Sequence, residues 1–116
     1  MSRYELYLND ILRAIEKIET SLRNNDEKSF SKDDNLIDAT SMRLQIIGES
    51  INKLPEEIKR RYKKINWKKL SEIRNIISHA YFKINPKIIW SIIEKDIPLL
   101  KKYVLEIKND LNSNEK

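Results

Sequence analysis

The sequence predicts an all-α protein, an up-down antiparallel helical bundle of four main helices plus a short connecting helix. Isoleucine and leucine recur at three- and four-residue spacing along most of the chain, which is the period of an amphipathic helix. One glycine and three prolines are too few turn residues for a sheet protein. With 116 residues the chain can build one hydrophobic core, so we expect a single domain over residues 1–116.

The net charge and the counts of cysteine and histidine limit the kinds of partner and metal site that this chain can have. Lysine and arginine number 23 against 18 acids, a formal net charge of +5, which permits a polyanionic partner without proving one. The absence of cysteine excludes a disulfide framework and a thiolate metal site, and the single histidine argues against a self-contained zinc site. We therefore expect neither a metal nor a small-molecule cofactor.

The amino terminus and the lengths of the apolar runs indicate where in the cell the protein is expected. Tyr4 and Glu5 stand where a secretory signal has its apolar core. No apolar run approaches the ~20 residues that span a bilayer. We expect a cytoplasmic protein.

Two long helices fill the first half of the chain. The first is expected over residues 2–24, and the polar residues 24–29 break its apolar pattern. Ser31 or Asp33 can cap the second, which runs to about Leu54. Gly48 falls in the middle of this helix, where it costs ~1 kcal/mol relative to alanine. We expect it to permit a close contact between helices, and room for a ligand is the alternative.

A short basic segment follows. Pro55 suits the first position of a short helix that ends near Tyr62. Five cations surround this tyrosine: Lys59, Arg60, Arg61, Lys63 and Lys64. Such a cluster is typical of RNA-backbone contacts, because phosphate neutralisation dominates nucleic-acid affinity and aromatic rings stack on bases. A solvated connection is the alternative. Asn66 is expected to cap the next helix, with Trp67 anchoring its start in the core.

The last helix is expected to begin at the pair Asn85-Pro86, an N-cap followed by proline at the first helical position. Its apolar residues continue to Leu111 at helical spacing. Pro98 is expected to kink this helix or to split off a terminal segment, because proline removes a hydrogen bond from a helix interior.

The helix before it carries the chain's chemistry. At ~100° per residue, Ile73, Ile76, Ile77 and Ala80 share one face, which predicts that this face packs into the core. The opposite arc holds Arg74, whose fork of donors matches phosphate oxygens, and His79, a residue type that can transfer protons near pH 7. Asn75, one turn before His79, can orient the imidazole. A surface ion-pair partner and an interfacial histidine with satisfied hydrogen bonds are the alternatives.

The spacing of these residues suggests a dimer. Five residues on a helix place Arg74 and His79 ~140° apart around the axis and ~7.5 Å apart along it. They can therefore address one phosphate only from opposite sides of a groove. A symmetric pair of motif helices supplies two arginines and two histidines across one groove, which suits cleavage of RNA without metal by its own 2′-hydroxyl.

The motif Arg74-Asn75-x-x-x-His79-x-Tyr81 resembles the R-x4-H-x-Y signature of the HepT-like toxins in the HEPN superfamily. Further matching stretches extend the resemblance over nearly the whole chain: Tyr7-Leu8-x-Asp10-Ile11-Leu12, Ile46-Ile47-Gly48-Glu49, Asn52-Lys53-Leu54, Ile65-x-Trp67, Ile89-Trp90 and Asp96-Ile97-Pro98-x-Leu100.

The resemblance implies a single HEPN-like helical domain and a dimeric ribonuclease toxin of a type VII toxin–antitoxin pair. Arg74 and His79 are then the catalytic residues, supported by Asn75. The implied partner is a minimal nucleotidyltransferase antitoxin, MntA, which transfers AMP to Tyr81. Assemblies larger than a dimer stay open. Two alternatives remain: a non-catalytic partner of such an enzyme whose Tyr81 accepts nucleotides, and a plain helical interaction protein.

Overall fold

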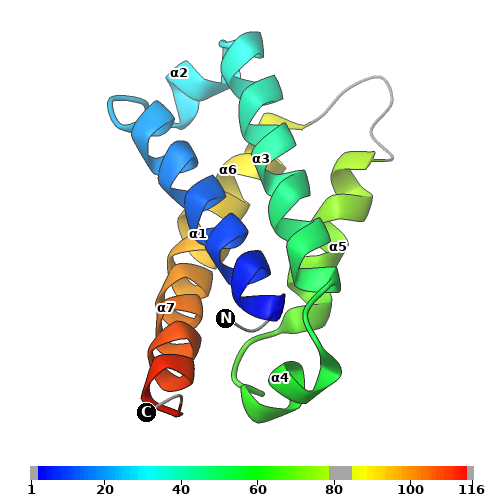
Figure 1. The fold of residues 1–116 in the computed structure, drawn as a ribbon. Coiled ribbons are helices and arrows are strands. Elements are labelled where there is room, and N and C mark those ends of the chain that lie inside the picture. Colours follow the sequence, from blue (N-terminus) through cyan, green and yellow to red (C-terminus); the bar gives the residue numbers. More distant parts are fainter. Residues whose placement is uncertain (1–2, 79–84, 115–116) are drawn as a thin grey trace.

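The structure is a computed structural model that describes residues 3–78 and 85–114. Every regular element in this part of the chain is helical, which confirms the predicted all-α fold (Figure 1). The elements are α1 (Arg3–Leu22), α2 (Glu27–Ser31), α3 (Asp34–Asn52), α4 (Glu56–Arg61), α5 (Trp67–Ser78), α6 (Pro86–Ser91), η1 (Ile92–Asp96) and α7 (Ile97–Asn114).

The main helices alternate in direction. In Figure 1, α1 and α5 rise, whereas α3 and the α6–η1–α7 segment descend. The helix α3 packs against α1 on one side and against α5 on the other, and α7 packs against α1. Two ion pairs at the surface tie α7 to α1 and α5 to η1: Nζ of Lys101 lies 2.9 Å from Oε1 of Glu19, and Nζ of Lys69 lies 3.0 Å from Oδ1 of Asp96. The up-down antiparallel arrangement is thus the one predicted.

The core lies along the axis between the helices. It consists of the apolar side chains that recur at helical spacing, together with Phe30 from the short helix α2. The largest fully buried side chains are Phe30, Leu8, Ile11, Ile15, Ile18, Leu44, Ile47, Ile51, Ile89, Leu100, Ile107 and Val104. None of the helices described in the structure combines the length and the apolar composition needed to cross a membrane.

Three helix starts carry the caps that the sequence predicts. The side chain of Asp33 accepts a hydrogen bond from the backbone N–H of the third residue after it, at 3.0 Å, so Asp33 rather than Ser31 caps α3. Asn66 caps α5 in the same way at 3.1 Å, and Asn85 caps α6 at 3.0 Å, two residues ahead. Pro55 differs by one position, since it is the N-cap of α4 and not its first residue.

The connection between α1 and α3 corrects the sequence prediction. Residues 24–29 were expected to form only a break, but α2 begins within them. A capping box starts this helix: the Ser29 N–H donates to the Asp26 carboxylate at 2.8 Å, and the Ser29 hydroxyl accepts from the Asp26 N–H at 3.0 Å. The helix has five residues, of which only Phe30 is buried, so the sequence shows no apolar period that would predict it.

The interruption expected at Pro98 takes the form of a π-helical turn. Because proline has no N–H, the carbonyl of Glu94 has no α-helical donor. In η1 the backbone instead bonds at longer range, and the N–H of Ile97 donates to the carbonyl of Ile92, five residues earlier. The chain therefore passes from α6 to α7 without a loop, and Pro98 splits off no terminal segment.

Candidate functional site

Helix α5 presents the motif arginine to solvent. Its residues Leu70 and Ile73 are buried, as the apolar period predicts, whereas Arg74 and Asn75 are exposed on the opposite arc. The side chains of Ile76 and Ile77 are outside the described residues, and so is Ala80. Arg74 and Asn75 thus lie side by side on a helix that the core holds firmly in place.

A close contact with α3 fixes the backbone beneath Arg74. A Cβ placed on Gly48 would lie 2.8 Å from the Cβ of Arg74 and 3.2 Å from its backbone nitrogen. Two carbon atoms in contact ordinarily lie ~3.5–4.0 Å apart, so only glycine lets α3 and α5 approach this closely. The predicted role of Gly48 in helix packing is confirmed, and the residue it accommodates is the candidate catalytic arginine.

Glu49 holds the side chain of the same arginine. Its Oε1 lies 3.5 Å from Nε of Arg74, and the two side chains are 42% and 46% exposed. Since the contact is made by Nε, the two Nη groups, which carry four of the five guanidinium N–H donors, stay outside this ion pair. In the sequence, Glu49 belongs to a stretch that carries the family resemblance and directly follows Gly48. Neither observation predicted that Glu49 contacts Arg74.

The other two motif residues, His79 and Tyr81, are outside the described residues. The structure thus brings together Arg74, Asn75, Gly48 and Glu49, and the predicted partnership of Arg74 with His79 stays a prediction.

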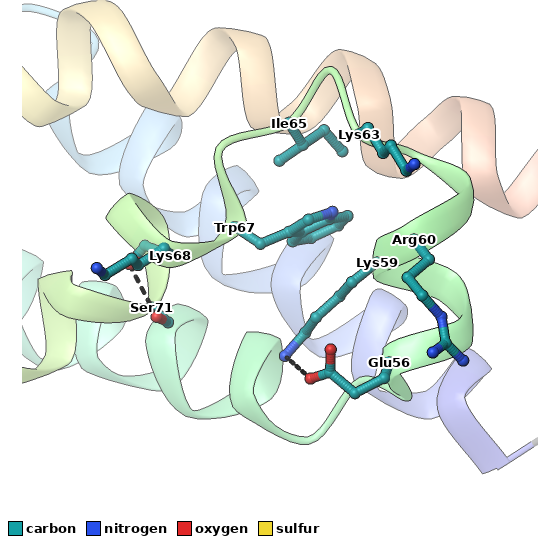
Figure 2. A pocket seen from close by; sticks show the side chains of 8 residues that line it. All are labelled: Glu56, Lys59, Arg60, Lys63, Ile65, Trp67, Lys68 and Ser71. Atoms are coloured by element: carbon teal, nitrogen blue, oxygen red, sulfur yellow. Dashed lines mark hydrogen bonds and ion pairs between the residues drawn. The ribbon is translucent and has the colours of Figure 1, made fainter.

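The basic segment folds around a cavity of about 440 Å³, which we call the basic pocket (Figure 2). Eight residues line it: Glu56, Lys59, Arg60, Lys63, Ile65, Trp67, Lys68 and Ser71. Three of the five predicted RNA-contacting cations are therefore gathered there. The remaining two, Arg61 and Lys64, are exposed and are not among the described lining residues.

The two aromatic residues of this region are anchored. The Tyr62 hydroxyl donates a hydrogen bond to Asp110 at 2.6 Å, which ties the end of α4 to α7. Burial, together with this hydrogen bond, raises the pKa of Tyr62 to about 12. Trp67 is buried and its Nε1 donates to the carbonyl of Tyr62 at 3.1 Å. Trp67 is therefore a structural anchor, as predicted, and it also forms a wall of the basic pocket.

Two exposed apolar side chains lie on α3 in the stripe that leads to Glu49. Met42 and Ile46 are 60% and 39% exposed. They precede Glu49 at seven and three residues, so all three follow one stripe of α3. A groove of about 480 Å³ between this stripe and α1 is lined by Met42, Ile46 and the cations Arg13 and Lys17, among others. Exposed apolar side chains that cluster are typical of protein contact surfaces.

Known proteins similar to this chain include several that are named after a ribonuclease activity. The family model described as "Ribonuclease HepT-like" matches residues 11–107. A protein of Methanocaldococcus jannaschii named "Gamma-glutamylcyclotransferase and putative RNase" is 39% identical over 111 residues, which cover 96% of this chain but only 50% of the relative. This chain thus spans half the length of that relative.

Two further relatives are closer in length to this chain. A "Putative RNase" of Caldanaerobacter subterraneus subsp. tengcongensis is 38% identical over 101 residues, which cover 87% of this chain and 90% of the relative. A "Probable ribonuclease HepT" of Thermococcus cleftensis is 36% identical over 95 residues, which cover 82% of this chain and 86% of the relative. No solved structure shows significant similarity to the chain.

Proposed function

This chain belongs to the HepT-like ribonuclease family, and from that membership we propose that it is the metal-independent RNase toxin of a type VII toxin–antitoxin pair. The observation that carries the proposal is the state of Arg74. Its guanidinium is exposed, its backbone is fixed against Gly48, and its Nε is paired with Glu49. A guanidinium held in this way can present its fork of donors to a phosphate without further reorganisation.

The reaction proposed is attack by the RNA's own 2′-hydroxyl. His79 removes the hydroxyl proton, the oxygen attacks the adjacent phosphorus, and the bond from phosphorus to the departing 5′-oxygen breaks. Arg74 stabilises the charge that gathers on the phosphate oxygens, and Asn75 orients the imidazole. The departing oxygen needs a proton in turn, which one histidine cannot supply while it holds the role of base. A second histidine from a second subunit meets this need.

We place the dimer contact on the stripe of α3 that runs from Met42 through Ile46 to Glu49. These apolar side chains are exposed in the single chain, and their stripe ends at Glu49, whose carboxylate contacts Arg74 of the neighbouring helix. A two-fold axis along this stripe buries Met42 and Ile46 against their copies. It also brings two Arg74 side chains to one groove, as the proposed chemistry requires.

The proposed antitoxin is an MntA-like nucleotidyltransferase that acts on the toxin in the cytoplasm. The Tyr81 hydroxyl loses its proton and attacks the α-phosphorus of ATP, so that AMP is bonded to the tyrosine oxygen and pyrophosphate leaves. The anionic adduct neutralises or occupies the phosphate site that Arg74 serves, because a phosphate beside an arginine forms charge-assisted hydrogen bonds.

The ribonuclease proposal is tested with purified protein and a single-stranded RNA in EDTA. We expect cleavage by the native chain, and loss of at least ~100-fold in kcat on His79→Ala or Arg74→Ala. Arg74→Lys should also fail to restore full activity, because lysine lacks the fork. Arg23→Ala, at an exposed arginine just after the end of α1, is the matched control. Cleavage that persists in His79→Ala refutes the proposal. An inactive native chain that still accepts AMP would make it the non-catalytic partner instead.

The dimer contact is tested separately. Met42→Glu combined with Ile46→Glu should shift the protein from dimer to monomer in sedimentation and abolish cleavage, because it places four like charges across the two-fold axis. Leu105→Glu, a similar change at an exposed leucine of α7, should leave the dimer intact. Dimers that survive the double substitution would place the contact elsewhere.

A further inference from the structure

The geometry points to a second phosphate-binding site for RNA, located in the basic pocket at the N-terminal end of α5. It holds a backbone phosphate of the same strand whose scissile phosphate lies at Arg74. This inference rests on the proposed ribonuclease function, which supplies the strand, and it adds Lys68 to the residues that the sequence singled out.

Unbalanced positive charge is the first reason. Four cations line the basic pocket against one carboxylate. The side chain of Lys59 is only 16% exposed, yet its ion pair with Glu56 is long, 3.8 Å, and that carboxylate is 79% exposed and so largely solvated. Lysine readily covers its aliphatic stem while its ammonium stays accessible, so the covered stem holds the Lys59 charge at the pocket with only a distant, hydrated partner. An anion in the pocket would complete its coordination.

The walls of the pocket are the second reason. The indole of Trp67 lies in the middle of the lining, between Ile65 and Lys59 (Figure 2). Apolar walls lower the local dielectric constant and strengthen the attraction between cations and a bound phosphate. Because Trp67 is hydrogen-bonded to the carbonyl of Tyr62, this wall is already in place before a ligand arrives. The volume of about 440 Å³ also lies within the ~300–1,000 Å³ of small-ligand sites.

Alignment with the motif is the third reason, and it favours a strand over a free nucleotide. Lys68, Ser71 and Asn75 follow one another at three and four residues, so they form a single stripe of α5 from the pocket to Asn75, the residue that follows Arg74. Lys68 and Asn75 are seven residues apart, a rise of about 10.5 Å. Such a distance corresponds to about three stacked nucleotides at roughly 3.4 Å each. A strand that follows this stripe reaches both sites.

The test compares two matched pairs of substitutions. Lys63→Gln with Lys68→Gln removes two cations that line the pocket. Arg61→Gln with Lys64→Gln removes two exposed cations of the same segment that do not line it. Both pairs change the net charge equally, so general attraction for RNA falls equally. All four side chains are exposed, so we expect the variants to fold. Circular dichroism is used to check this.

The measurements are binding of a single-stranded octanucleotide by fluorescence anisotropy and cleavage of the octanucleotide and a dinucleotide. The pocket pair should raise Kd about tenfold and lower the slope of log K against log salt by ~0.7 for one lost phosphate contact. The control pair should raise Kd less than about threefold. The preference for the octanucleotide over the dinucleotide, as a ratio of kcat/KM, should fall at least about fivefold in the pocket pair only.

Failure of this inference and failure of the proposed function give different results. Equal weakening of octanucleotide binding by both pairs overturns the pocket even if the native protein cleaves RNA. An undiminished preference for the octanucleotide in the pocket pair also overturns it. Selective weakening by the pocket pair in a native protein that never cleaves RNA leaves the pocket standing and removes the ribonuclease.

Discussion

Replacing Gly48 by alanine separates the packing of the bundle from the positioning of its arginine. The new Cβ would lie 2.8 Å from the Cβ of Arg74, and contact at ~3.5 Å or more requires α3 and α5 to move apart locally by about 0.7 Å. The atom met is close to the backbone of α5, so no flexible side chain can simply swing away. The displacement therefore falls on the residue that carries the chemistry.

The stability change is expected to be small. Overpacking costs about 1–3 kcal/mol, whereas alanine in place of glycine inside a helix returns about 1 kcal/mol. The net loss is about 0–2 kcal/mol, well below the 5–15 kcal/mol that typically holds a domain together. We expect a folded protein whose Tm falls by no more than about 10 °C.

The loss of RNA cleavage is expected to be much larger than the loss of stability. A displacement of about 1 Å in a positioned group can cost ~100-fold in rate, so kcat of Gly48→Ala should fall by about one to two orders of magnitude. Thermal unfolding and RNA cleavage are measured on the same sample. Asp38→Ala, at an exposed position of α3, controls for helix propensity and should gain stability without losing activity. A Gly48→Ala protein that is more stable than native and fully active would refute the reasoning.

Three further predictions each concern a single residue. Glu49→Gln should change the free energy of unfolding by less than about 0.5 kcal/mol, because the ion pair with Arg74 is half exposed. The kcat for RNA cleavage should fall several-fold, while RNA binds more tightly. Unchanged kinetics would leave Glu49 without a positioning role. Tyr62 has its pKa raised to about 12 in the folded protein, so its contribution to the unfolding free energy should be constant below the ordinary tyrosine pKa of ~10 and decline between pH ~10 and 12. Tyr62→Phe, titrated by chemical denaturation, should remove that part of the decline, and an identical decline in the variant would contradict the assignment. Incubation with a cognate nucleotidyltransferase and ATP should add AMP mass to the native chain but not to Tyr81→Phe, and a gain kept in the variant would move the modification elsewhere.

The sequence predicted the long helices and most of their caps because those features repeat or are local. Apolar residues at helical spacing announce a buried face many times over, and Asp33, Asn66 and Asn85 bond to backbone groups only two or three residues away. The short helix α2 escaped because five residues are too few to show a period. Gly48 was read correctly as a place of close packing, since glycine inside a helix needs a reason.

The partners in the site could not be predicted, because they join residues distant in the chain. The predicted up-down bundle makes α3 and α5 antiparallel, but it does not show that Glu49 and Arg74 lie opposite each other. The basic segment was singled out by composition, but composition does not distinguish Lys63, which lines the basic pocket, from Lys64, which does not. Lys68 was missed for the same reason, since it joins the pocket only through the fold.

The central claim is that two subunits share one active site, and mixing the native chain with an inactive variant tests it most directly. His79→Ala protein is purified, shown to be inactive on RNA in EDTA, and then combined with native protein under conditions that exchange subunits. A mixed dimer contains two arginines but a single histidine, which cannot serve as base and acid at once. The account predicts that cleavage falls with the square of the native fraction, because only dimers of two native chains are active. Cleavage that falls in direct proportion to the native fraction, or a native protein that is active as a monomer, would contradict it.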